Sequence, residues 1–177
     1  MDPLWSNIFR KKLDEDSLTN FLKNLPTFSG LRHKDLRTLE AIVHQRNYKP
    51  NELVFEEGDP GSGMYMIRGG SVRIFARLAD GGEDELAILE SGDFFGETTL
   101  TAPAARSASA RTMEATELVG LFRSDLLELS ERQPSVANNI LFGITRVISE
   151  RLQASSIEIR RLQNQLGEHS SPEGAET

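Results

Sequence analysis

The residues best suited to chemistry lie in one short stretch, from Asp93 to Ala108. Gly96 has no Cβ, so the backbone there can approach a ligand closely. The turn that begins at Glu97 is expected to be helical, and its unpaired N–H groups suit an anion. Nine residues later, Arg106 supplies a planar fork of donors that fits a phosphate group, and Ser107 adds a hydroxyl. A carboxylate for a sugar hydroxyl and a guanidinium for a phosphate predict a nucleotide site.

The pattern Phe95-Gly96-Glu97, followed by Arg106-Ser107-Ala108, resembles the phosphate-binding cassette of the cyclic nucleotide-binding domain family. That family includes bacterial catabolite activator proteins, regulatory subunits of cyclic-AMP-dependent kinase and gated ion channels. The resemblance extends over roughly residues 25–152. It implies that Glu97 accepts a hydrogen bond from the ribose 2′-hydroxyl and that Arg106 pairs with the cyclic phosphate. The ligand-binding residues expected in the cassette are Gly96, Glu97, Thr98, Arg106, Ser107 and Ala108.

The cassette departs from the family pattern at Thr98-Thr99, where the family usually has an aliphatic residue followed by a small one. Either Thr98 weakens the packing of the cassette, or its hydroxyl faces the phosphate. A surface ion pair between Glu97 and Arg106 is the purely structural alternative to a binding site.

The chain around the cassette divides into helical and strand-forming parts. Before the strands, helical periodicity marks residues 4–12, residues 14–25 and a third segment carrying Leu36, Leu39, Ile42 and Val43. From Arg46 onward, short apolar runs alternate with turns at spacings of roughly 8–12 residues, which predicts an antiparallel sandwich or barrel.

With the resemblance, the expected fold is α+β: an antiparallel β-roll (a double-stranded β-helix or jelly roll) flanked by N-terminal helices and a long C-terminal helix. The resemblance also places Ile74 and Leu86 on the apolar wall under the ribose and base. The expected divisions are 1–45 for the N-terminal helices, 46–123 for the β-roll with its cassette at 94–109, 124–167 for the C-terminal helices, and 168–177 for a disordered tail.

The long helix after Pro134 carries a seam with a period of 3.5 residues, which indicates a parallel homodimer. Its members are Leu141, Thr145, Ile148, Leu152, Ser155, Ile159, Leu162 and Leu166. The stretch from Arg151 to Ser156 resembles the catabolite activator segment whose Thr-Ser pair meets adenine from both subunits. That alignment needs a four-residue insertion after Arg106, and it implies base contacts from Ser155 and Ser156. Without the gap, Arg151 falls at the base.

The composition limits the class of protein. The 177 residues carry a formal net charge of −7, with 38% hydrophobic and 27% charged residues, which is typical of a soluble globular chain. Direct nucleic-acid binding requires a basic footprint, and a membrane span requires a much longer apolar run than any present. The start Met1-Asp2-Pro3 lacks the pattern of a signal peptide. We therefore expect a cytoplasmic protein without nucleic-acid or membrane contacts.

The residue types needed for catalysis are scarce. Cysteine is absent, which excludes disulfides, thiol catalysis and Cys-based metal sites. Cupin barrels, which are similar to β-rolls, hold metals with clustered histidines, whereas His33, His44 and His169 are scattered along this chain. We therefore expect no catalytic residue, no metal and no cofactor.

The function expected from these observations is that of a sensor without an enzymatic activity. Its expected ligand is a 3′,5′-cyclic nucleotide, with cyclic AMP favoured and cyclic GMP as the second candidate. Its output is expected to pass through the long helix to a dimer interface or an unknown downstream protein. One alternative is a degenerate domain that binds no nucleotide and serves as a dimeric scaffold. Another is the sensor part of a transcription regulator, although the eleven residues after Leu166 are too few and too Gly/Ser/Glu-rich for a helix-turn-helix.

Overall fold

The computed structural model describes residues 17–169, and the helix expected over 4–12 lies outside them. The first described helices are α2 (Leu18–Asn24) and α3 (His33–Glu40). The Ser17 hydroxyl accepts a hydrogen bond of 3.2 Å from the Asn20 backbone N–H, and this cap begins α2 four residues later than expected. Helix α3 ends at Glu40, yet Ile42 and Val43 still pack against the core from the connection that follows.

The β-roll consists of two four-stranded antiparallel sheets and one short strand pair. The first sheet has the order β1-β10-β4-β7, the second β2-β9-β5-β6, and β3 pairs with β8. The strands are β1 (His44–Tyr48), β2 (Leu53–Phe55), β3 (Pro60–Gly61), β4 (Gly63–Gly69), β5 (Ser71–Arg77), β6 (Glu83–Glu90), β7 (Phe94–Phe95), β8 (Ala104–Ala105), β9 (Ser109–Thr112) and β10 (Thr116–Phe122). The expected α+β class with a β-roll is confirmed.

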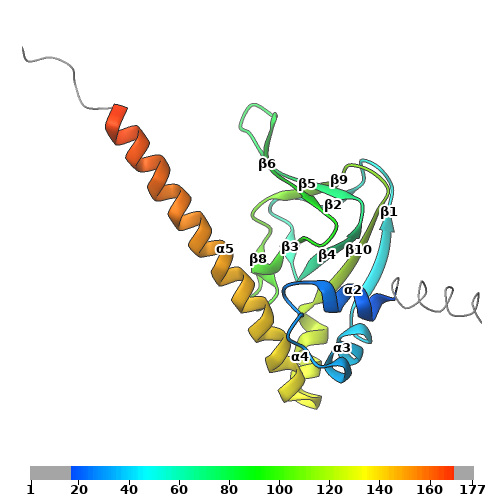
Figure 1. Cartoon of the computed structure of the whole chain (residues 1–177). Helices are drawn as coiled ribbons and strands as arrows, with labels where there is room; N and C mark the ends of the chain where they lie inside the picture. Colours follow the sequence, from blue (N-terminus) through cyan, green and yellow to red (C-terminus); the bar gives the residue numbers. More distant parts are fainter. Residues whose placement is uncertain (1–16, 170–177) are drawn as a thin grey trace, which may run out of the picture.

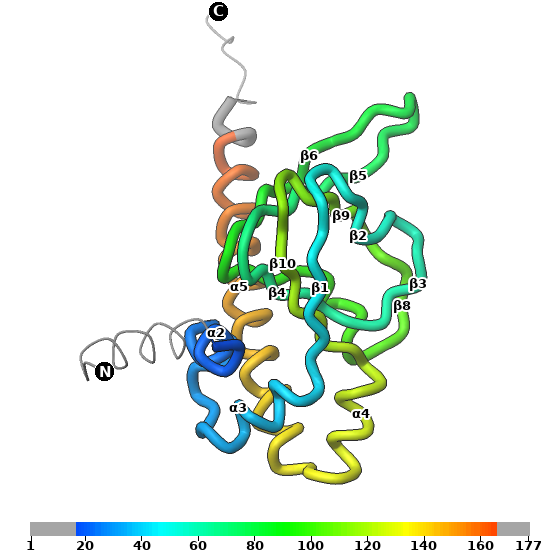
Figure 2. Tube along the Cα trace, turned by 90° about the vertical axis from the view of Figure 1, so that its right-hand side faces the viewer, coloured from blue at the N-terminus to red at the C-terminus, as the bar shows by residue number. Residues whose placement is uncertain are grey.

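The chain ends in two helices, α4 (Arg123–Arg132) and α5 (Pro134–His169), and α5 continues two residues past the expected boundary at 167. Figures 1 and 2 show α2, α3 and α4 gathered at one end of the roll, with α5 rising along its side. The larger core lies between these helices and the first sheet, and the smaller one lies inside the roll. No helix among residues 17–169 is long and apolar enough to cross a membrane.

Helix α5 changes environment along its length. Its first half buries Ile140, Ile144 and Val147 in the larger core, and two members of the expected seam, Leu141 and Ile148, also pack there. Beyond Glu150 every described side chain is exposed. Figure 1 shows this part of the helix extending past the roll. The exposed part keeps an apolar stripe of Leu152, Ile159 and Leu162. A stripe of this kind suits a partner helix.

Three polar side chains attach α5 to the rest of the fold. The Asn139 amide lies 3.4 Å from the Asp35 carboxylate of α3. Arg146 donates to the Pro26 carbonyl at 2.7 Å, and Arg151 donates to the Phe94 carbonyl at 3.1 Å. These bonds tie α5 in turn to α3, to the loop after α2 and to the strand that opens the cassette.

The Asp35 carboxylate provides a test of the first attachment. It is fully buried and accepts hydrogen bonds from Arg32, which hold the pKa of Asp35 below its ordinary value of 3.8 against the opposing effect of burial. A carboxyl with a lowered pKa stabilises the fold above pH 3.8 and loses that contribution as the pH falls through its folded-state pKa.

Asp35→Asn should therefore lower the free energy of unfolding by about 1–3 kcal/mol at neutral pH. Urea unfolding of both proteins at pH 7 and near pH 3 measures this difference. The gap between them should shrink at the lower pH, because the native carboxyl is then losing its charge. An equal gap at both pH values would show that the charge of Asp35 does not stabilise the fold.

Candidate functional site

A pocket of about 260 Å³ lies between the cassette, the inner face of β5 and β6, and α5. Its lining combines a short polar edge with an apolar wall and two guanidinium groups. The lining residues are Phe55, Ile74, Ala87, Leu89, Phe94, Phe95, Gly96, Glu97, Thr98, Arg106, Ser107, Ala108 and Arg151. The structure thus brings together all six residues expected in the cassette and one of the two expected on the wall.

The cassette begins where β7 pairs with β4, Phe95 lying opposite Tyr65. Gly96 then adopts a left-handed conformation with φ of 75°, which residues other than glycine rarely adopt. A Cβ on Gly96 would also lie 2.5 Å from Nη1 of Arg106. The turn expected after Gly96 is the 3₁₀-helix η1 (Glu97–Thr99). Glycine is required here both for the backbone conformation and for the close approach of the arginine.

Arg106 is the centre of the pocket's polar edge and is only 6% exposed. Its Nη1 donates to the carbonyls of Gly63 at 2.8 Å and Gly96 at 3.0 Å, and to the Thr99 hydroxyl at 3.0 Å. The guanidinium carbon lies 4.1 Å from the centre of the Phe55 ring. These contacts hold the guanidinium in one orientation at the cassette.

The guanidinium is held in place without being neutralised. Its buried Nε has no hydrogen-bond acceptor among the described residues. Burial lowers the pKa of the Arg106 side chain below its ordinary value, while Tyr65, Asp59 and Glu97 act in the opposite direction. A buried cation with an unused donor favours an anion as its partner.

The two threonines that depart from the family pattern have different environments. Thr99 is fully buried, and its hydroxyl lies 3.3 Å from the Gly63 carbonyl and 3.2 Å from the Gly96 carbonyl while accepting from Arg106. Thr98 is exposed and lines the pocket. Thr99 therefore belongs to the support of the arginine, and Thr98 faces the space a ligand would enter.

The apolar wall comes from β5 and β6. Ile74 lies opposite Ala87, and both line the pocket together with Leu89. Leu86 does not line it and is 54% exposed. The register of β5 and β6 shifts between Ile74 and Phe75, and successive side chains of a strand point to opposite faces. The wall residue expected at Leu86 is thus replaced by its neighbour Ala87.

Helix α5 closes the pocket with Arg151. Its guanidinium lies 3.9 Å from the centre of the Phe94 ring, and its Nη1 bonds the Phe94 carbonyl. Ser155 and Ser156 are exposed and do not line the pocket, and the Ser156 hydroxyl donates to the Leu152 carbonyl at 2.8 Å. Ser155 lies one helical turn, about 6 Å, beyond Arg151. The ungapped alignment was the signal that identified Arg151, and the roles of the two serines stay predictions.

The described residues were also compared with the requirements of a metal site. Among residues 17–169 there is no group of three or more His, Asp or Glu side chains that could hold a metal ion. The pocket combines the buried Arg106 guanidinium at its edge with an apolar wall, an arrangement that suits a ligand joining a phosphate to a flat apolar ring.

Comparisons with known proteins agree with this description. The profile of the family described as cyclic nucleotide-binding domain matches residues 45–133. The cyclic AMP receptor protein of Thermus thermophilus is 36% identical over 138 residues, which cover 78% of this chain and 62% of that protein. A CRP-like cAMP-activated global transcriptional regulator of Mycobacterium tuberculosis is 30% identical over 129 residues, covering 73% of this chain and 56% of the relative.

Solved structures of bacterial transcriptional regulators have a similar fold. The N-terminal domain of a transcriptional regulator from Streptomyces coelicolor aligns with a TM-score of 0.67 at 27% identity, covering 76% of this chain and 96% of that one. The catabolite activator protein of Thermus thermophilus aligns with a TM-score of 0.66 at 36% identity, covering 78% and 63%.

The chain belongs to the cyclic nucleotide-binding domain family. Its fold and relatives place it among the regulatory modules of that family. It spans about 56–62% of the length of the two curated relatives.

Proposed function

We propose that the chain binds a 3′,5′-cyclic nucleotide, cyclic AMP in preference to cyclic GMP, and acts as a sensor without chemistry on the ligand. The observation that carries the proposal is Arg106, a buried guanidinium with an unused donor at the edge of a pocket whose opposite side is apolar. Because the protein is acidic overall, this local cation is needed to attract a phosphate.

The parts of such a ligand match the parts of the pocket. The cyclic phosphate would lie against Arg106, Ser107 and the N–H groups of η1, and the Glu97 carboxylate would accept from the ribose 2′-hydroxyl. The purine would lie against the wall that contains Ile74 and Ala87. Ser155 and Ser156 would reach a purine only after a shift of α5, or from the α5 of a second copy.

The preference for cyclic AMP rests on the relatives. Those at 36% and 30% identity carry names that refer to cyclic AMP, whereas the cGMP-dependent protein kinase of Toxoplasma gondii is 29% identical. The same names favour one alternative, in which this chain is the sensor part of a transcription regulator.

The output would pass through α5. Arg151 joins the pocket to this helix, and the stripe of Leu152, Ile159 and Leu162 is available to a second copy or to a downstream protein. If α5 can adopt two placements, a ligand shifts the balance between them only to the extent that it binds one placement more tightly than the other. The residue that couples ligand binding to the placement of α5 should therefore be a residue of α5 that contacts the ligand. Arg151 is the residue of α5 that lines the pocket.

Calorimetric titration of the purified protein with cyclic AMP, and then with cyclic GMP, tests the proposal. We expect micromolar binding of cyclic AMP and weaker binding of cyclic GMP. Stronger binding of cyclic GMP would reverse the preference. No heat and no thermal shift with either nucleotide would contradict the sensor function and favour the non-binding scaffold.

A further inference from the structure

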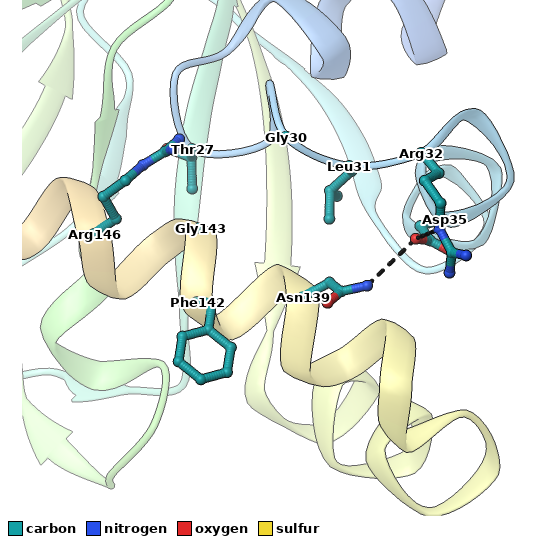
Figure 3. Close-up of a pocket in the computed structure, with 9 residues that line it drawn as sticks. All are labelled: Thr27, Gly30, Leu31, Arg32, Asp35, Asn139, Phe142, Gly143 and Arg146. Carbon is teal, nitrogen blue, oxygen red and sulfur yellow. Dashed lines mark hydrogen bonds and ion pairs between the residues drawn. The ribbon is translucent and has the colours of Figure 1, made fainter.

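A second concave site lies along the first half of α5 and shares no lining residue with the nucleotide pocket. It is a groove of about 510 Å³ between α5, α3 and the loop that joins α2 to α3. Figure 3 shows this loop passing beside α5, with Arg146 reaching the loop at Thr27 and Asn139 directed at Asp35. The groove is lined by Thr27, Gly30, Leu31, Arg32, Asp35, Asn139, Phe142, Gly143 and Arg146.

Phe142 is unusually exposed for a large apolar residue of the groove. Its side chain is 76% exposed, the most of any large apolar residue described, and Figure 3 shows its ring extending from α5 away from the loop. Asn139, Phe142 and Arg146 lie three and four residues apart and so share one face of α5. The stripe that begins at Leu152 follows a different face, continuous with the partly buried Ile148. A helix docked on that stripe would leave Phe142 uncovered.

The charged groups of the groove already have partners. Arg32 and Asn139 bond the Asp35 carboxylate, and Arg146 bonds the Pro26 carbonyl. One polar group remains, because the buried Thr27 hydroxyl has no hydrogen-bond partner among the described residues. Buried hydroxyls usually have a partner. Because the charged side chains are paired and Leu31 and Phe142 line the groove, it favours an apolar occupant rather than an ion.

We propose that the chain's own residues 1–16 dock in this groove, with the stripe of Leu4, Trp5, Ile8 and Phe9 packed against Leu31 and Phe142. The four residues of this stripe have helical spacing. Their large apolar side chains could cover the exposed ring of Phe142.

The length and position of this segment fit the groove. Residues 1–16 end next to Ser17, and the backbone from Ser17 through α2 to Thr27 extends about 22 Å at most. The seven residues between Phe9 and Ser17 span about 23 Å when extended. The stripe can therefore reach the groove of its own subunit.

Trp5 provides the test, because it is the only tryptophan of the chain. We would measure the emission maximum of the full chain and its quenching by acrylamide, without nucleotide, for the parent protein and for Phe142→Glu. The parent should show a shielded tryptophan. Phe142→Glu should shift the emission to longer wavelength and raise the quenching constant. The control is Ile88→Glu, which changes a half-exposed apolar residue of β6 and should leave both readings unchanged.

A mixing experiment separates the chain's own segment from that of a second copy. Phe142→Glu retains Trp5 but has an altered groove, whereas Trp5→Ala retains the groove without a fluorophore. Mixing the two should leave the emission of Phe142→Glu unchanged. Restored shielding would show docking between copies and overturn the proposal as stated. The docking proposal would be overturned altogether if Trp5 were exposed in the parent protein. It would also be overturned if Phe142→Glu left the emission and the quenching of Trp5 unchanged. These readings require no ligand, so they stand apart from the nucleotide proposal.

Discussion

Replacing Arg106 with alanine is expected to raise the dissociation constant for the cyclic nucleotide by about 30- to 5,000-fold. The estimate follows from the loss of about 2–5 kcal/mol when one partner of a buried charge pair is removed. Without the guanidinium, the phosphate would enter a desolvated pocket and find only a hydroxyl and backbone N–H groups. Calorimetric titration of the variant and the parent protein measures the change.

Two further variants make this test specific. Arg106→Lys keeps the charge but loses the fork of donors, three of whose acceptors are in place at Gly63, Gly96 and Thr99, so we expect an affinity between those of the parent and the alanine variant. Arg111→Ala removes an arginine only five residues away that bonds Glu83 and does not line the pocket. It should bind normally. Unchanged affinity in Arg106→Ala would rule out the cassette as the phosphate site.

The part of the site that could be predicted is local in sequence. Gly96, Glu97 and Arg106 lie within eleven residues of one another, so their types and spacing alone indicate a cradle for a phosphate. The support of Arg106 is not local, because its Nη1 bonds the carbonyl of Gly63, 43 residues earlier in the chain. Nothing in the residue types near Gly63 indicates that its carbonyl would face the cassette. Thr99 likewise looked like a departure until the fold placed its hydroxyl against the guanidinium.

The placements that the sequence alone leaves open depend on which face of a strand or helix points inward. The resemblance places Leu86 on the wall, but the register shift of β6 beside Ile74 directs Ala87, and not Leu86, into the pocket. A strand's alternation predicts two faces without stating which is inward. Helix α5 presents the same difficulty, because one helical turn separates Arg151 from Ser155 and only the packing of α5 decides which of them meets the pocket.

Gly143→Ala is expected to destabilise the protein, although the same change inside a helix normally stabilises it by about 0.5–1 kcal/mol. Gly143 lies in α5 where the loop after α2 crosses it. A Cβ at this position would lie 2.0 Å from the carbonyl oxygen of Thr27. The obstacle is backbone, so the loop and the helix would have to separate. We expect the free energy of unfolding to fall by about 1–3 kcal/mol, as in other overpacked sites.

Ser149→Ala is the matched control for this test, because Ser149 lies on an exposed part of the same helix and the change should slightly stabilise it. Urea unfolding of the two variants should therefore give shifts of opposite sign relative to the parent. Separation of the loop from α5 would also break the bond from Arg146 to Pro26, one of the three attachments of the helix. If nucleotide affinity depends on the placement of α5, it should change in Gly143→Ala and not in Ser149→Ala. Stabilisation by both variants would mean that the loop and α5 do not touch at Gly143, and that α5 lies elsewhere.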